Sequence, residues 1–196
     1  TLIKKLKKNL NIPIHLHTHS TTGLADATNF MAFEAGVDNI DTSISSFSNL
    51  YAHTATESMI AMMYDNQSSP FNNELLTEIS KYFENIRKNY SKYEGSMKGI
   101  DVKMLTNQVP GGMLSILEKQ LVDLKKQHKL MDLIKEIPRI RKDVGYIPLV
   151  TPTSQIVGAQ ALSNIIDGER YKNLNKEFID LIRGSYGKIP GVVDLD

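Results

Sequence analysis

Apolar and polar positions follow two different periods in the first third of the chain. Over residues 12–18 and 37–44 apolar side chains recur at every second position, which predicts two strands. Over residues 24–35 and 55–64 they recur every three or four positions, which predicts helices. Strands that alternate with helices of this length are typical of βα units on a parallel sheet, so this part favours an α/β fold.

The pattern becomes helical after the polar segment at 66–70, Asn-Gln-Ser-Ser-Pro. Amphipathic helices are predicted over residues 74–93, 114–129, 130–144, 154–166 and 176–182, and a short extended segment over 102–109. We therefore expect one domain over residues 1–68 and a mostly helical domain over residues 69–196.

The composition excludes several classes of function. The 23 Lys and Arg residues balance 22 Asp and Glu residues, so we expect no nucleic-acid partner and no basic membrane-binding surface. No apolar run approaches the ~20 residues that span a bilayer, so we expect no direct membrane insertion. The chain has no cysteine, which removes disulfides and thiolate chemistry and fits a cytoplasmic protein.

Three of the five histidines lie two residues apart in the first predicted strand. Side chains alternate between the faces of a strand, so His15 and His17 point the same way, whereas His19 lies past the strand. Two imidazoles at a strand end can bind one divalent metal such as Zn, Mn or Co. A chance pair that ends hydrogen-bonded in a surface turn is the alternative, but the end of a strand in a βα unit favours a metal site. His53 and His128 stand alone in the sequence and are interpreted as ordinary surface or packing residues.

A second cluster of polar groups precedes a helix near the C-terminus. Thr151 followed by Pro152 predicts a helix start, because threonine caps helices and proline is tolerated at the first helical position. The hydroxyls and the amide within residues 151–155 could instead hold a polar ligand or relay a proton, and their spacing does not separate these hypotheses. The segment 110–112, Pro-Gly-Gly, predicts a turn and lacks the features of a phosphate loop.

Three motifs occur in the order seen in the carboxyltransferase subunits of biotin-dependent enzymes, which the chain resembles over nearly all of its length. This family includes the alpha subunit of oxaloacetate decarboxylase, the B subunit of two-subunit pyruvate carboxylase and the related transcarboxylase subunit. The motifs are His-Leu-His-Thr-His-Ser-Thr-Thr-Gly at 15–23, Val-Pro-Gly-Gly-Met-Leu-Ser at 109–115 and Val-Thr-Pro-Thr-Ser-Gln-Ile-Val-Gly at 150–158.

The resemblance implies the C-terminal part of a TIM (β/α)8 barrel followed by a helical, funnel-like domain. His15 and His17 match the family's metal ligands, and Thr151 matches the threonine that carries a proton between biotin and the methyl carbon of pyruvate. Ser154 and Gln155 match positions near the biotin. Gln155 is similar to the subunit-type members, since single-chain pyruvate carboxylases typically carry lysine there.

The resemblance also implies partners. A carboxyl group would pass between pyruvate or oxaloacetate and biotin on a separate carrier domain. The family's other metal ligands, an aspartate and a carboxylated lysine, belong to earlier strands, so we expect a piece of a longer protein that needs an N-terminal barrel half. A homo-oligomer is expected, and association with a membrane decarboxylase complex is compatible with the family. Ile116 departs from the asparagine expected there.

Two other hypotheses remain open. A metal-dependent aldol-type synthase or lyase shares the His-x-His strand but does not require the motifs at 109–115 and 150–158. A non-catalytic assembly fragment, whose helices mediate subunit contact, requires neither histidine. The effect of Thr151→Ala on carboxyl transfer and the metal content of His15 and His17 variants distinguish these hypotheses.

Overall fold

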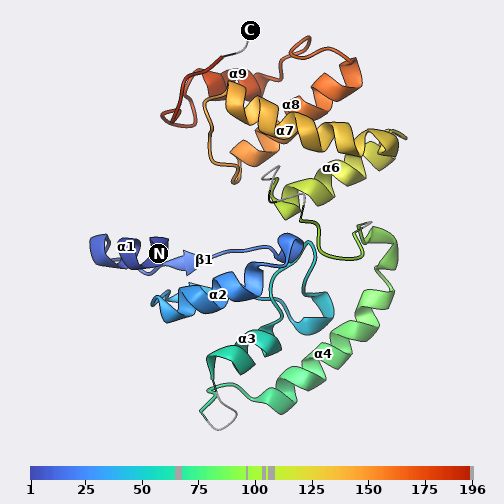
Figure 1. Cartoon of the computed structure of the whole chain (residues 1–196). Coiled ribbons are helices and arrows are strands. Elements are labelled where there is room, and N and C mark those ends of the chain that lie inside the picture. Colours follow the sequence, from blue (N-terminus) through green and yellow to red (C-terminus); the bar gives the residue numbers. More distant parts are fainter. Residues whose placement is uncertain (65–67, 96, 103–104, 106–108, 195–196) are drawn as a thin grey trace. The chain divides into compact units, whose positions relative to one another are not determined.

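The computed structural model describes residues 1–64, 68–95, 97–102, 105 and 109–194 (Figure 1). The chain forms two compact units, Thr1–Val102 and Lys103–Asp196. Each unit is described by itself. None of the helices in the described residues has the length and apolar character needed to cross a membrane.

The first unit contains a small parallel sheet. Its two strands are β1 (His15–Leu16) and β2 (Asn39–Ile40), paired with His15 opposite Asn39 and Leu16 opposite Ile40. The predicted βα unit is therefore present, although the paired strands are shorter than the sequence pattern suggested. The other elements of this unit, in chain order, are α1 (Leu2–Asn9), η1 (Ser20–Thr22), α2 (Ala25–Glu34), η2 (Ser45–Phe47), α3 (Thr56–Met63), α4 (Asn73–Lys88) and η3 (Ser91–Tyr93).

Helix α2 connects the strands and packs against α3 (Figure 1). Its small buried residues allow the close approach, and a buried polar residue in the same helix, Asn29, is hydrogen-bonded at both ends of its amide. The Asn29 amide nitrogen donates to Thr54 Oγ1 at 3.0 Å, and its oxygen accepts from Thr18 Oγ1 at 2.8 Å. Because unpaired buried polar groups are costly, these bonds fix the segments that follow β1 and precede α3 relative to α2.

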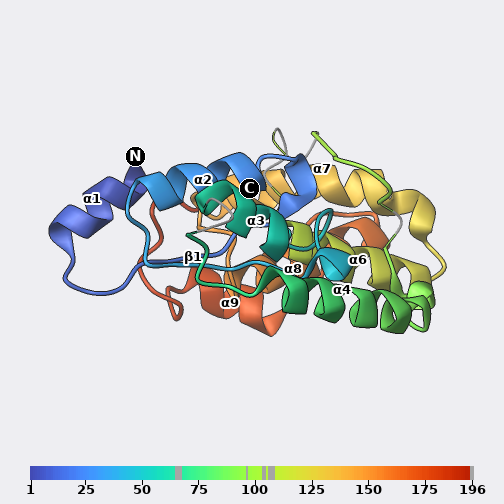
Figure 2. The ribbon, with the colours of Figure 1, turned by 90° about the horizontal axis from the view of Figure 1, so that it is seen from below.

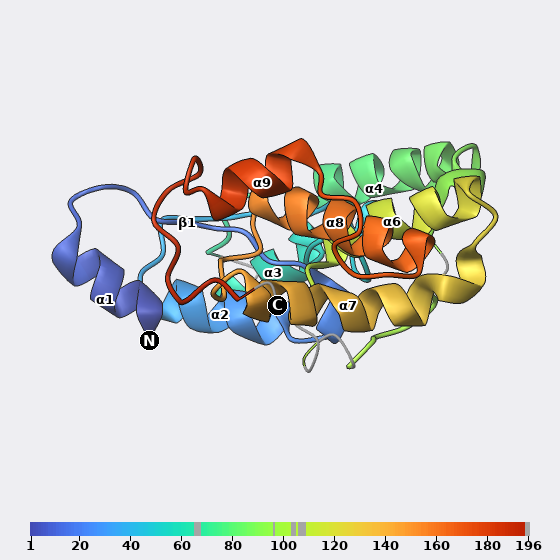
Figure 3. The same cartoon turned by 90° about the horizontal axis from the view of Figure 1, so that it is seen from above.

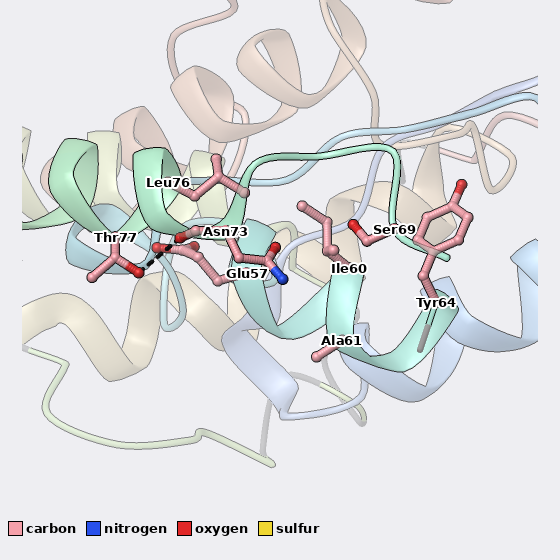
Figure 4. A pocket seen from close by; sticks show the side chains of 8 residues that line it. All are labelled: Glu57, Ile60, Ala61, Tyr64, Ser69, Asn73, Leu76 and Thr77. Carbon is pink, nitrogen blue, oxygen red and sulfur yellow. Dashed lines mark hydrogen bonds between the residues drawn. The ribbon is translucent and has the colours of Figure 1, made fainter. Parts of the chain in front are cut away.

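Helix α4 belongs to the first compact unit, which ends at Val102. Phe83 of α4 packs edge-on against Phe47 of η2, with 5.9 Å between ring centroids. Arg87 Nη1 donates to Ser46 O at 2.7 Å. A pocket of about 100 Å³ lies between α3 and α4 (Figure 4). The polar segment at 66–70 thus precedes a helix that returns to the same unit.

The second unit is helical, as the sequence predicts. It contains α6 (Gly111–Asp123), η4 (Gln127–Lys129), α7 (Leu130–Asp143), α8 (Thr153–Asp167) and α9 (Lys176–Ile182). Helix α8 lies between α6 and α9 (Figure 2), and α7 runs alongside it (Figure 3). Val157 and Ala161 of α8 are fully buried at the centre of this unit.

Two segments at the start of this unit, 102–109 and 110–112, were predicted to be non-helical. The turn predicted at 110–112 is wrong, because Pro110 is the N-cap of α6 and both glycines lie in its first turn, with Leu114 N donating to Pro110 O at 3.1 Å. Proline is favourable at a helix start, and this bond begins the helical ladder. Of the extended segment predicted over 102–109, residues 103–104 and 106–108 lie outside the described residues.

A buried carboxylate links α7 to α8 and the segment after it. Glu136 is 3% exposed. Its Oε1 accepts from Asn164 Nδ2 at 2.9 Å and from Arg170 Nε at 2.7 Å, and its Oε2 accepts from Arg139 Nη1 at 2.9 Å. These donors compensate for the removal of the charge from water.

Replacing Arg170 with methionine should lower the free energy of unfolding by about 3 kcal/mol, because a buried carboxylate then loses a charged partner. The matched control is Lys172→Met, since Lys172 and Glu169 form an exposed 3.7 Å pair. Such surface pairs contribute ~1 kcal/mol or less. Urea denaturation of the complete protein compares the variants, and equal effects of the two substitutions would contradict the prediction.

Candidate functional site

The carboxyl ends of β1 and β2 bring two histidines to one aspartate. The parallel register that sets His15 opposite Asn39 continues to place His17 beside Asp41. His15 Nε2 lies 2.6 Å from Asp41 Oδ1, and His17 Nδ1 lies 2.6 Å from Asp41 Oδ2. His15 and His17 therefore do lie on the same side of the chain, as alternation predicts, and each contacts one oxygen of the Asp41 carboxylate.

Two further imidazoles extend this group. The ring of His53 lies 4.5 Å from that of His17 and 4.9 Å from that of His19, centroid to centroid. His19 Nδ1 is 2.6 Å from Tyr51 O. His53 is therefore a packing residue, and the rings that it packs against are those of the cluster. No sequence period indicates this contact, because His53 reaches the cluster from an irregular segment between η2 and α3.

The protonation of the cluster follows from its contacts. Hydrogen bonds from His17 and His15 hold the pKa of Asp41 below its ordinary value, so the carboxylate is ionised at neutral pH. Burial lowers the pKa of His19, although its bond to the Tyr51 carbonyl opposes that shift. His19 is therefore neutral near pH 7.

The histidine pair fits part of a metal site. Imidazole nitrogens are common ligands of Zn²⁺ and similar ions, and two imidazoles side by side at a strand end could supply half of a tetrahedral set. Within the described residues, however, no group of three or more His, Cys, Asp or Glu side chains is arranged to hold a metal ion. The hydroxyls of Ser20 and Thr21, directly after the cluster, are buried and have no hydrogen-bond partner among the described residues. This region therefore has the chemistry of a polar site whose ligand set is incomplete.

The second candidate region is the start of α8. Thr151 is exposed, and its side chain does not cap the helix, because Pro152 is the N-cap and Ser154 N donates to Val150 O at 3.0 Å. The predicted capping role of Thr151 is therefore wrong. Thr153 Oγ1 instead bonds Val150 O at 2.7 Å and holds the preceding loop. Within the described residues the Thr151 hydroxyl forms no hydrogen bond and is available for another role.

An open groove of about 260 Å³ runs between α6 and α8. Ser154 and Gln155 line it, Ser154 buried and Gln155 exposed. Gly158 forms part of its wall, where a Cβ atom would lie 3.0 Å from Met113 Cε. The remaining lining residues are Ile116, Leu117, Gln120 and Ala159. The two residues predicted to lie near biotin thus line one mostly apolar groove, and Thr151 precedes them by three and four positions in the sequence.

Comparison with known proteins assigns both units. Residues 1–83 match the family described as HMGL-like, and residues 104–196 match the conserved carboxylase domain. The chain is 42% identical to the B subunit of pyruvate carboxylase from Methanocaldococcus jannaschii over 98% of its length. It is 39% identical to the 2-oxoglutarate carboxylase large subunit of Hydrogenobacter thermophilus, again over 98%. The chain is therefore similar over nearly its whole length to subunits of carboxylases.

A solved structure agrees with this assignment. The chain matches the carboxyl transferase domain of Rhizobium etli pyruvate carboxylase with pyruvate and biocytin, with a TM-score of 0.86 and 27% identity. The match covers 96% of this chain and 34% of that one. The chain likewise spans 34% of the Methanocaldococcus jannaschii relative and 30% of the Hydrogenobacter thermophilus one. It therefore corresponds to about a third of the length of the relatives it matches.

Proposed function

We propose that the chain is the carboxyltransferase component of a biotin-dependent enzyme and moves a carboxyl group between biotin and pyruvate or oxaloacetate. The observation that supports this most is the meeting of His15 and His17 at the carboxylate of Asp41, where the parallel strands end. In this proposal the first unit is the C-terminal portion of a TIM barrel and the second is the helical, funnel-like domain. The HMGL-like match and the likeness to the Rhizobium etli domain support that assignment. The N-terminal barrel half, the biotin carrier domain and further copies of the chain are the proposed partners.

The two units would contribute different chemistry. His15 and His17 would hold a divalent metal, Zn, Mn or Co, whose Lewis acidity polarises the ketone of the keto acid. Biotin on its carrier domain would supply or receive the carboxyl group. Ser154 and Gln155 would orient the biotin ring, and the apolar wall of the α6–α8 groove would exclude water from it.

Thr151 would hold the proton that moves between the biotin nitrogen and the methyl carbon of pyruvate. A hydroxyl accepts one proton while it donates another, so it does this without being ionised. The position of Thr151 supports the role, because its hydroxyl neither caps α8 nor bonds elsewhere in the described residues. The direct test is transfer of labelled carboxyl between pyruvate and oxaloacetate by the complete protein, with and without free biotin. A requirement for biotin is expected.

A substitution in the groove tests the assignment of biotin to it. Ile116 lines the groove and is half-exposed, so Ile116→Trp fills the groove without disturbing the core. We expect the KM for free biotin to rise by about tenfold or more, since a filled pocket excludes its ligand. Val122→Trp is the matched control, because Val122 is similarly exposed on the same helix and does not line the groove. Equal KM values for the two variants would contradict the assignment.

The HMGL-like match of residues 1–83 favours one second candidate, a metal-dependent aldol-type lyase. Such an enzyme would cleave or form a carbon–carbon bond in an acyl-CoA or keto acid substrate without biotin. The two functions differ in their need for biotin. Turnover of the keto acid that needs no biotin and is unchanged by Ile116→Trp would support the lyase.

A further inference from the structure

The C-terminal segment, residues 189–194, is paired with the turn that follows α7. Gly191 N donates to Gly145 O at 2.9 Å, and Asp194 N donates to Asp143 O at 2.7 Å. Val144 and Val193 form an antiparallel bridge between these two contacts. Val144 is fully buried. A segment without a helix or a strand of its own is thus joined by backbone hydrogen bonds to one short stretch of chain.

That stretch determines the direction of the loop that carries Thr151. Gly145 and the non-glycine residue Tyr146 are both left-handed, with φ of +74° and +59°. Tyr146 N donates to Arg141 O at 2.8 Å, and Arg141 Nε donates to Ile147 O at 3.1 Å. A left-handed residue with a side chain persists only where its surroundings hold it. The loop from Ile147 to Thr151 therefore follows directly after a turn whose conformation depends on neighbouring contacts.

Two glycines meet where the segment crosses this turn. A Cβ atom on Gly191 would lie 2.9 Å from Gly145 O and 3.1 Å from its Cα. A Cβ atom on Gly145 would lie 2.8 Å from the carbonyl carbon of Gly191. Each obstacle is backbone, which cannot rotate away as a side chain can. Any side chain at position 191 must therefore push the segment and the turn apart.

We propose that residues 189–194 form a positioning segment that holds the Gly145–Tyr146 turn and, through it, the Thr151 hydroxyl in the place needed for proton transfer. This inference rests on the proposed carboxyl transfer. The segment touches neither substrate nor biotin in this role. The segment affects the reaction only by fixing the position of the loop that carries Thr151.

The test compares Gly191→Val and Gly191→Ala with Val192→Ser in the complete protein. Val192 is 84% exposed, so its substitution leaves the contact intact. For Gly191→Val we expect kcat for carboxyl transfer to fall by about tenfold or more, since small misplacements of a reacting group are costly, whereas the KM for pyruvate stays within about twofold. Within residues 146–151, the hydrogen-bonded amides of Tyr146 and Val150 should exchange about tenfold faster, with α7 and α8 unchanged. Gly191→Ala should show a smaller effect of the same kind, and Val192→Ser none.

Hydrogen exchange distinguishes a failure of the positioning role from a failure of the proposed carboxyl transfer. If the wild-type complete protein transfers no carboxyl group, the proposed function fails, while exchange in residues 146–151 still reports whether the segment holds the loop. Unchanged exchange there in both Gly191 variants would overturn the positioning role. Exchange that rises equally in α7, α8 and α9 would also overturn it, because the segment would then stabilise the whole unit. Faster loop exchange with an unchanged kcat would overturn it too, because the held position would then not matter for transfer.

Discussion

Thr151→Ala in the complete protein should reduce carboxyl transfer by about 10²- to 10⁴-fold, the usual contribution of a positioned proton-transfer group. The expected mechanism is loss of the hydroxyl alone. Thr151 is exposed, and its side chain neither caps α8 nor forms a hydrogen bond within the described residues, so the substitution leaves the helix start intact. The melting temperature should therefore stay that of the wild type. The measurement is exchange of label between pyruvate and oxaloacetate in the presence of biotin.

Thr151→Ser is the control, because it keeps a hydroxyl on the same Cβ atom and should retain transfer within about tenfold of the wild type. Thr153→Ala gives the opposite comparison. It removes the bond to Val150 O and should lower stability while the Thr151 hydroxyl remains. Full transfer by Thr151→Ala would refute the proton-carrying role and leave this residue as an ordinary loop position.

The double substitution His15→Ala/His17→Ala should remove the metal and all measurable transfer. Both imidazoles contact Asp41 where β1 ends, and loss of both leaves no histidine pair at this strand end to bind an ion. Elemental analysis of the purified complete protein should give less than about a tenth of the wild-type metal content, since each lost ligand weakens binding by at least an order of magnitude.

His128→Ala is the matched control, since His128 is exposed in η4 of the second unit. His53→Ala separates ligation from packing, because His53 contacts His17 only through its ring. We expect that variant to keep its metal with weaker affinity. Wild-type metal content in the double variant would contradict the site, and metal loss in His128→Ala would show that the assay reports general damage.

The sequence predicted the elements better than the contacts between them. Periodicity located α2, α3 and the helices of the second unit, because an apolar stripe must be buried wherever the chain places it. It also placed His15 and His17 on one face, because the alternation of a strand is local. Asp41 was within reach of the same reasoning, since it follows the second strand of a parallel pair and such ends meet at one edge of the sheet.

Other features could not be derived from local pattern. His53 joins the cluster through an irregular segment, and no period records that approach. Thr151-Pro152 has the composition of a helix cap, yet backbone carbonyls satisfy the first amides of α8: Ser154 N donates to Val150 O, and the next two amides donate to Pro152 O. The division after Val102 depends on α4 packing against η2, a contact between segments about forty residues apart, as in the bond from Arg87 to Ser46. Each of these outcomes was decided by tertiary partners.

Asn29 has a consequence for the histidine cluster as a whole. Its amide bonds Thr18, the residue after His17, and Thr54, the residue after His53. Asn29 and Thr54 are buried and Thr18 is half-buried, so displacing either segment would break a bond in a place that water reaches poorly. The two histidine-bearing segments are therefore expected to fluctuate in concert, with α2 setting the distance between their imidazoles. A helix residue that has no part in the chemistry thus governs how precisely the cluster is maintained.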